Sequence, residues 1–193
     1  IIRREGCGDV LAEGVKRASE KVGGPAADCA IYVAKGSSPR GHDHRGRWEE
    51  MLDTAVGSTG SLESGMLIAP QELGLPLRIN PFDPDQVSRI VAGMLGRRHF
   101  EDSLGACIFT TRTPLENLCQ GLNAATGWSY TAEDAMRFGR RTACLLRAFN
   151  VRSGIGPELE LPSKRYGSQP HNGPAAGHNV MEHWESMIAS WYE

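Results

Sequence analysis

The spacing of apolar residues along the chain predicts a mainly helical protein. Over residues 9–22, every third or fourth residue is apolar, as on one face of an amphipathic helix, and a pair of glycines follows, where glycine commonly ends a helix. These apolar positions are Leu11, Val15, Ala18 and Val22. A short helix is predicted over residues 47–57, and three longer ones begin at sequences typical of helix N-termini, at residues 83–86, 113–116 and 131–134.

The helix that begins at residue 131 is predicted to bury an apolar face. The residues expected on that face are Ala135, Phe138, Thr142, Leu145, Leu146 and Phe149. A last helix is predicted from about residue 180 to the end, after a Gly- and Pro-rich stretch over residues 153–178 that indicates a surface arm. Residues 29–36, CAIYVAKG, are typical of a β-strand. The predicted fold class is therefore mainly α, with one short strand near the N-terminus.

Composition and charge indicate which binding partners and which cellular compartment suit the chain. Of the 193 residues, 40% are hydrophobic and 23% are charged, as is usual for a globular protein. The net charge of −2 argues against nucleic acid or an anionic membrane as a partner, and no apolar run of about 18 residues exists to span a bilayer. Five cysteines without a Cys-x-x-Cys pair indicate a reducing, cytoplasmic setting. The chain begins without Met and ends within a helical pattern, so we expect both ends to be cut from a longer chain.

The stretch DSLGAC, residues 102–107, is the first candidate for chemistry. Asp102 can accept N–H donors from a heterocycle, Gly105 lets the backbone approach a flat ligand, and the thiolate of Cys107 can bind iron. The alternative is a turn between helices in which Cys107 packs as a small apolar residue, as Cys119 and Cys144 are expected to do on helix faces. One cysteine cannot hold a cluster alone, so other ligands would have to come from elsewhere.

The histidines in PRGHDHRG, residues 39–46, form the second candidate. An imidazole titrates near neutrality, so His42 or His44 could supply a proton to a reaction at a metal. The alternatives are a solvated loop without a role, and Arg40 as a structural partner for a carboxylate. A metal site within the His-Asp-His run is disfavoured, because adjacent positions on a turn seldom converge on one ion.

Five segments, in order along the chain, resemble the tungsten-containing aldehyde ferredoxin oxidoreductase family. They are REGCGDVLAEGVKRASEKVG (4–23), YVAKGSSPRG (32–41), DSLGAC with GLNAATGW (102–107 and 121–128), RAFNVRSG (147–154) and VMEHWESMIASWYE (180–193). The resemblance implies the helical C-terminal part of that family. Residues 1–36 would be the tail of its middle domain, and residues 37–193 would be its C-terminal domain, with both ends truncated.

The resemblance also implies cofactors. Enzymes of the family hold tungsten, or sometimes molybdenum, between two pterin dithiolenes, and a [4Fe-4S] cluster passes electrons to ferredoxin or to an electron-transfer subunit. Cys107 corresponds to the fourth cluster ligand, after three in an upstream Cys-x2-Cys-x3-Cys motif. Asp102 corresponds to a pterin-binding residue, assisted by the backbone at Gly105 and Ala106. The upstream cysteines are absent from these residues, so the segment alone is expected to hold neither cofactor.

Departures from the family pattern bear on the substrate. Ala106 replaces the usual Leu before the cysteine, and Ser38 replaces an Asp. Ser61 stands where the family's substrate-facing His is expected, so His42, His44 and Ser61 are predicted to line the substrate side. These changes resemble the class II benzoyl-CoA reductase branch, which reduces the aromatic ring of an acyl-CoA. The alternatives are a ferredoxin-dependent oxidoreductase that converts aldehydes to carboxylic acids, and a helical scaffold without cofactors.

Overall fold

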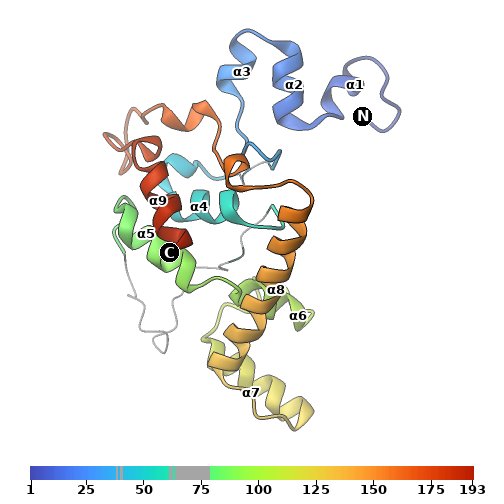
Figure 1. The fold of residues 1–193 in the computed structure, drawn as a ribbon, viewed down its shortest axis with the longest axis vertical. Coiled ribbons are helices and arrows are strands. Elements are labelled where there is room, and N and C mark those ends of the chain that lie inside the picture. The colour runs from blue at the N-terminus through green and yellow to red at the C-terminus, as the bar shows by residue number, and fades with distance from the viewer. Residues whose placement is uncertain (38, 40, 61–62, 64–78) are drawn as a thin grey trace.

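The computed structural model describes residues 1–37, 39, 41–60, 63 and 79–193. Within these residues the chain is mainly helical (Figure 1), as predicted. The α-helices are α1 (Cys7–Leu11), α2 (Gly14–Val22), α3 (Pro25–Cys29), α4 (Trp48–Val56), α5 (Pro84–Gly93), α6 (Arg97–Ser103), α7 (Leu115–Thr126), α8 (Ala132–Arg152) and α9 (Trp184–Tyr192). Short 3-10 helices are η1 (His44–Gly46), η3 (Pro157–Leu159), η4 (Lys164–Gly167) and η5 (Val180–Glu182). None of the described helices is both long and apolar enough to cross a bilayer.

The stretch predicted as a strand, residues 29–36, is reduced to a single β-bridge. Cys29 ends α3, and Val33 forms one antiparallel bridge with Pro162. The chain turns directly afterwards, where the Gly36 N–H donates to the Val33 carbonyl oxygen at 2.8 Å. Residues with strand propensity form a strand only where a partner continues the pairing, and the turn ends the pairing here.

Two apolar clusters hold the described helices together. In the larger one, α4, α5 and α9 pack around Trp48, Met51 and Met187, which are fully buried. In the smaller one, Phe100 of α6 and Leu115 of α7 pack against α8. Figure 1 shows α8 running from the neighbourhood of α4 down to α7, so this helix spans the distance between the clusters, whereas α1 and α2 lie away from both.

The packing of α6 on α8 depends on two glycines. A Cβ at Gly139 would lie 1.9 Å from the Gly96 carbonyl oxygen, and Gly96 has a φ of +95°, which favours glycine. The α8 face with Ala135, Gly139 and Ala143 is therefore buried, and most of the predicted face is not. The large apolar side chains that are exposed against prediction are Phe138, Leu145 and Phe149. The prediction failed because backbone contact at Gly139, and not apolar area, sets the rotation of the helix.

Candidate functional site

Helix α6 carries a buried ion pair that anchors the DSLGAC loop. The Arg97 Nε lies 2.8 Å from Oε1 of Glu101, one helical turn on, and both side chains are 2% exposed. The Arg97 Nη2 also donates to the carbonyl oxygen of Thr113 at 2.7 Å. Because Thr113 lies at the far end of the loop that follows α6, Arg97 fixes both ends of that loop to one helix.

Asp102 lies on the exposed side of the same helix. Its side chain is 49% exposed, and Oδ1 lies 2.8 Å from Nη2 of Arg98. An ionised carboxylate has acceptor capacity for several donors, so the pairing with Arg98 leaves room for a ligand's N–H groups. The predicted acceptor is therefore accessible at the end of α6.

The loop after α6 presents Cys107 to solvent. Gly105 has a φ of +69°, and no atom lies within 4 Å of where its Cβ would be, so the backbone is open there. Cys107 is a free, exposed cysteine, which rules out the alternative of a core cysteine. Its carbonyl oxygen accepts from the N–H of Thr110 at 2.8 Å and of Thr111 at 3.2 Å, which closes a tight turn. Ala106, between Gly105 and Cys107, is half-buried.

These residues fit a cofactor that is completed by ligands from elsewhere. An exposed thiol next to an open glycine suits a cluster ligand with backbone close by. Within the described ranges, no group of three or more His, Cys, Asp or Glu side chains could hold a metal ion. Of the other two cysteines expected in helices, Cys119 is buried as predicted and Cys144 is exposed, so the prediction for Cys144 was wrong.

His42 and His44 meet at one carboxylate, Glu50 of α4. The Nδ1 of His42 lies 2.8 Å from Oε2 of Glu50, and the Nε2 of His44 lies 3.5 Å from the same oxygen, which is an ion-pair distance without hydrogen-bond geometry. The Arg47 Nη1 donates to the other oxygen at 2.5 Å. His44 is fully buried, whereas the side chain of His42 is 49% exposed.

The contacts around Glu50 keep its carboxyl group ionised. Burial by itself raises the pKa of the Glu50 carboxyl, but the contacts with His44, His42 and Arg47 outweigh burial and hold that pKa well below its usual range. Glu50 is therefore an anion that favours a proton on Nδ1 of His42 and leaves Nε2 as the free ring nitrogen. A carboxylate that orients an imidazole in this way is the arrangement expected of a proton carrier.

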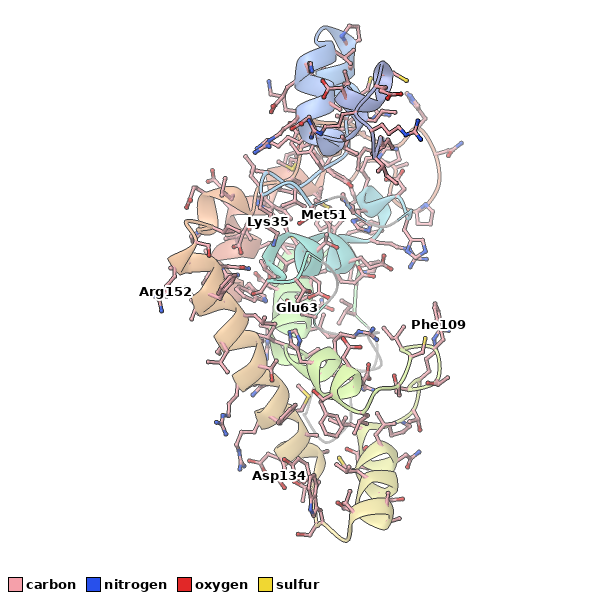
Figure 2. The ribbon with its side chains drawn as sticks, turned by 90° about the vertical axis from the view of Figure 1, so that its right-hand side faces the viewer. Lys35, Met51, Glu63, Phe109, Asp134 and Arg152 are labelled. Atoms are coloured by element: carbon pink, nitrogen blue, oxygen red, sulfur yellow. The ribbon has the colours of Figure 1, made fainter. Side chains whose placement is uncertain are left out.

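The predicted substrate residue Ser61 lies outside the described residues. Two positions on, Glu63 is 2% exposed, and its Oε1 accepts from the N–H groups of Ser58 at 2.6 Å and Thr59 at 2.9 Å. The carbonyl oxygen of Glu63 accepts from the Arg98 N–H at 3.3 Å, and Figure 2 shows Glu63 between α4 and α6. Glu63 is thus attached to the helix that bears Asp102.

The predicted site residues therefore fall into two groups. Asp102, Gly105, Ala106 and Cys107 lie together at the end of α6 and on its loop, and Figure 2 shows Phe109 of that loop on the opposite side from α8. His42 and His44 lie together at Glu50, and no described hydrogen bond or ion pair joins them to the first group. Sequence reasoning missed Glu50 and Glu63, although a glutamate near the start of a helix that follows a histidine-rich loop is a possible signal.

Comparison with known proteins shows the family of the chain. A family model described as "Aldehyde ferredoxin oxidoreductase, domains 2 & 3" matches residues 1–193. The chain belongs to the aldehyde ferredoxin oxidoreductase family. It is 33% identical, over 100% of its own length and 32% of the relative's, to a tungsten-containing aldehyde ferredoxin oxidoreductase of Pyrococcus furiosus. Similarly named proteins of Pyrococcus horikoshii and Thermococcus kodakarensis are 33% and 31% identical, again over 100% of the chain and 32% of each relative.

The chain thus spans about a third of the length of these relatives. The matching family model covers two domains together, and the boundary that we place between residues 36 and 37 stays a prediction.

Proposed function

We propose that these residues belong to a tungsten or molybdenum bis-pterin, iron–sulfur oxidoreductase and form part of its cofactor site. The observation that carries the proposal is the exposed free thiol of Cys107, on a loop anchored at both ends by Arg97 and opened by Gly105. Membership of a family whose relatives are named as tungsten-containing oxidoreductases supports it.

In this proposal each residue of the DSLGAC loop has a distinct role. The Cys107 thiolate is one ligand of a [4Fe-4S] cluster, and Asp102 accepts N–H groups of a pterin, with the backbone at Gly105 and Ala106 close by. When bound, the two cofactors supply the redox chemistry. The other cluster ligands are expected from the upstream Cys-x2-Cys-x3-Cys motif, which lies outside these residues.

His42 is the proposed proton carrier. Oxidation of an aldehyde releases protons, and reduction of a ring consumes them, so either reaction needs a side chain that exchanges protons near neutral pH. Glu50 holds Nδ1 of His42 at 2.8 Å, which leaves Nε2 to accept or release the proton. The fully buried His44 contacts the same Glu50 oxygen, with its Nε2 at 3.5 Å. The predicted place of Ser61 on the substrate side rests on the resemblance alone.

For the substrate, we infer an aldehyde that is oxidised to a carboxylic acid, with electrons passed to a ferredoxin in the cytoplasm. The names of the relatives favour this reaction. The second candidate is reduction of an aromatic acyl-CoA, as in class II benzoyl-CoA reductase. It is favoured by Ser61, which stands where the substrate-facing His of aldehyde oxidoreductases is expected.

The test is anaerobic purification of the full-length protein, followed by metal analysis and turnover with an artificial electron carrier. We expect about four irons and one tungsten or molybdenum per chain, because one cluster and one pterin metal require them. Reduction of the carrier by short aldehydes supports aldehyde oxidation, and consumption of reduced carrier with benzoyl-CoA supports the second candidate. A full-length protein without iron, tungsten and molybdenum would contradict both candidate reactions. The remaining interpretation would then be a helical scaffold without cofactors.

A further inference from the structure

A small cavity lies next to the His42–Glu50 pair and opens between η1 and η4. Its volume is about 290 Å³, enough for a small polyatomic ion or for the end group of a larger ligand. Its polar lining comes from His42, Asp43, His44, Arg45, Arg165 and Tyr166. The first four come from one loop and the last two from η4, so the cavity joins segments that are far apart in the sequence.

The one carboxylate among the described lining residues is already neutralised. Oδ1 of Asp43 accepts from the Arg45 Nε at 3.0 Å, and Oδ2 accepts from Nη2 at 2.7 Å. Nη1 of Arg45 donates to the Ser168 hydroxyl at 3.0 Å, so each nitrogen of this guanidinium makes a hydrogen bond. Asp43 and Arg45 therefore cancel in charge and brace one wall of the cavity.

Two polar side chains of the cavity, Arg165 and Tyr166, have donor capacity and lack partners among the described residues. Arg165 is exposed, and its guanidinium makes no hydrogen bond or ion pair with any described residue. Tyr166 is 3% exposed, and its hydroxyl likewise has no partner among the described residues. Burial raises the pKa of Tyr166 to about 12, so this hydroxyl keeps its proton and remains a donor.

The position of Tyr166 is fixed by its neighbours. Its ring stacks on that of His44, with centroids 6.3 Å apart and an angle of 24° between the planes. Tyr166 is also part of the larger apolar cluster, so its hydroxyl is held on a rigid support.

We propose that this cavity binds a small oxyanion, the carboxylate or phosphate group of a ligand, through Arg165 and Tyr166. A guanidinium and a phenolic hydroxyl can both donate to such a group, and the carboxylate of the lining residue Asp43 is already paired. The site needs no metal or pterin, so it stands independently of the proposed redox function.

The test is isothermal titration calorimetry on the full-length protein with inorganic phosphate and, separately, with acetate. The variants are Arg165→Gln and Tyr166→Phe, and the control is Lys164→Gln, an exposed cation beside Arg165 that does not line the cavity. We expect saturable binding of one anion to the wild-type protein. Arg165→Gln should weaken the affinity about tenfold or more, because a charge-assisted hydrogen bond is lost. Tyr166→Phe should weaken the affinity less, and Lys164→Gln should leave it unchanged.

The stronger of the two ligands identifies the chemistry: acetate indicates a carboxylate and phosphate a phosphoryl group. The proposal is overturned if wild-type protein binds neither anion, if Arg165→Gln binds as wild type does, or if Lys164→Gln weakens binding as much as Arg165→Gln. Calorimetry requires no loaded cofactor, so failure here is distinct from an absence of metals, which would contradict the redox function instead.

Discussion

Replacement of Arg97 by Met should loosen the DSLGAC loop far more than replacement of its neighbour Arg98. The side chains of Arg97 and Glu101 are each 2% exposed. Removal of one partner leaves the charge of the other buried, which costs about 3–5 kcal/mol. The Thr113 carbonyl oxygen loses its donor as well, which costs about 1 kcal/mol more. The Arg98–Asp102 pair is 22% and 49% exposed, so its loss should cost at most about 1 kcal/mol.

Hydrogen exchange of the full-length protein, read by mass spectrometry on peptides over residues 97–114, measures this locally. A loss of about 3 kcal/mol raises the opening equilibrium constant on the order of 100-fold, so these amides should exchange that much faster in Arg97→Met. Arg98→Met should exchange within about tenfold of wild type. The double variant Arg97→Met/Glu101→Leu should recover part of the protection, because neither charge of the pair is then left buried without the other.

The reasoning fails if Arg97→Met and Arg98→Met exchange alike, or if the double variant exchanges faster than Arg97→Met. The first result would mean that the pair is not buried in the protein, and the second that Glu101 has another partner.

Two further substitutions test the packing and the histidine cluster. Gly139→Ala should lower the melting temperature, because the new Cβ would lie 1.9 Å from the Gly96 carbonyl oxygen. The control Gly121→Ala in α7 adds a Cβ that meets nothing within 4 Å, so the melting temperature should stay equal or rise. Equal losses in the two variants would refute the close approach at Gly139. The depressed pKa of Glu50 means that its contribution to stability is present above its usual pKa of 4.5 and is lost as the pH falls towards the folded-state pKa. Glu50→Gln should therefore flatten the fall in melting temperature below about pH 5, an effect that Glu20→Gln, at an exposed residue, should not have.

Local signals in the sequence predicted several helix starts correctly. Asp83 accepts from the Gln86 N–H at 3.0 Å, and Thr131 forms a capping box with Asp134, as the sequence suggested. The third expected start is shifted, because Thr113 does not cap α7 and its hydroxyl accepts from the Asn117 amide at 2.8 Å instead. Caps depend on residues three apart, so the sequence alone carries most of this information.

Features that depend on contacts across the chain were not predictable in the same way. The segment RRHFEDS contains two Arg–acid pairs with the same spacing, 97 with 101 and 98 with 102, and only the fold makes one buried and the other exposed. Likewise, the apolar pattern of α8 does not reveal that backbone contact at Gly139 turns its large residues outward. The DSLGAC stretch could be predicted as a candidate because its residues are consecutive in the sequence, whereas Glu50 was missed because its contacts with His42 and His44 depend on the fold.

The most direct test of the central claim is the iron content of the full-length protein, purified without oxygen, after Cys107→Ser. Cys29→Ser and Cys144→Ser are matched controls, because these cysteines are also free and exposed. Since a hydroxyl is a poor iron ligand, we expect Cys107→Ser to lose most of its iron and the absorption of the cluster, while both controls keep about four irons per chain. Unchanged iron in Cys107→Ser, or an equal loss in a control, would contradict the assignment of Cys107 as a cluster ligand.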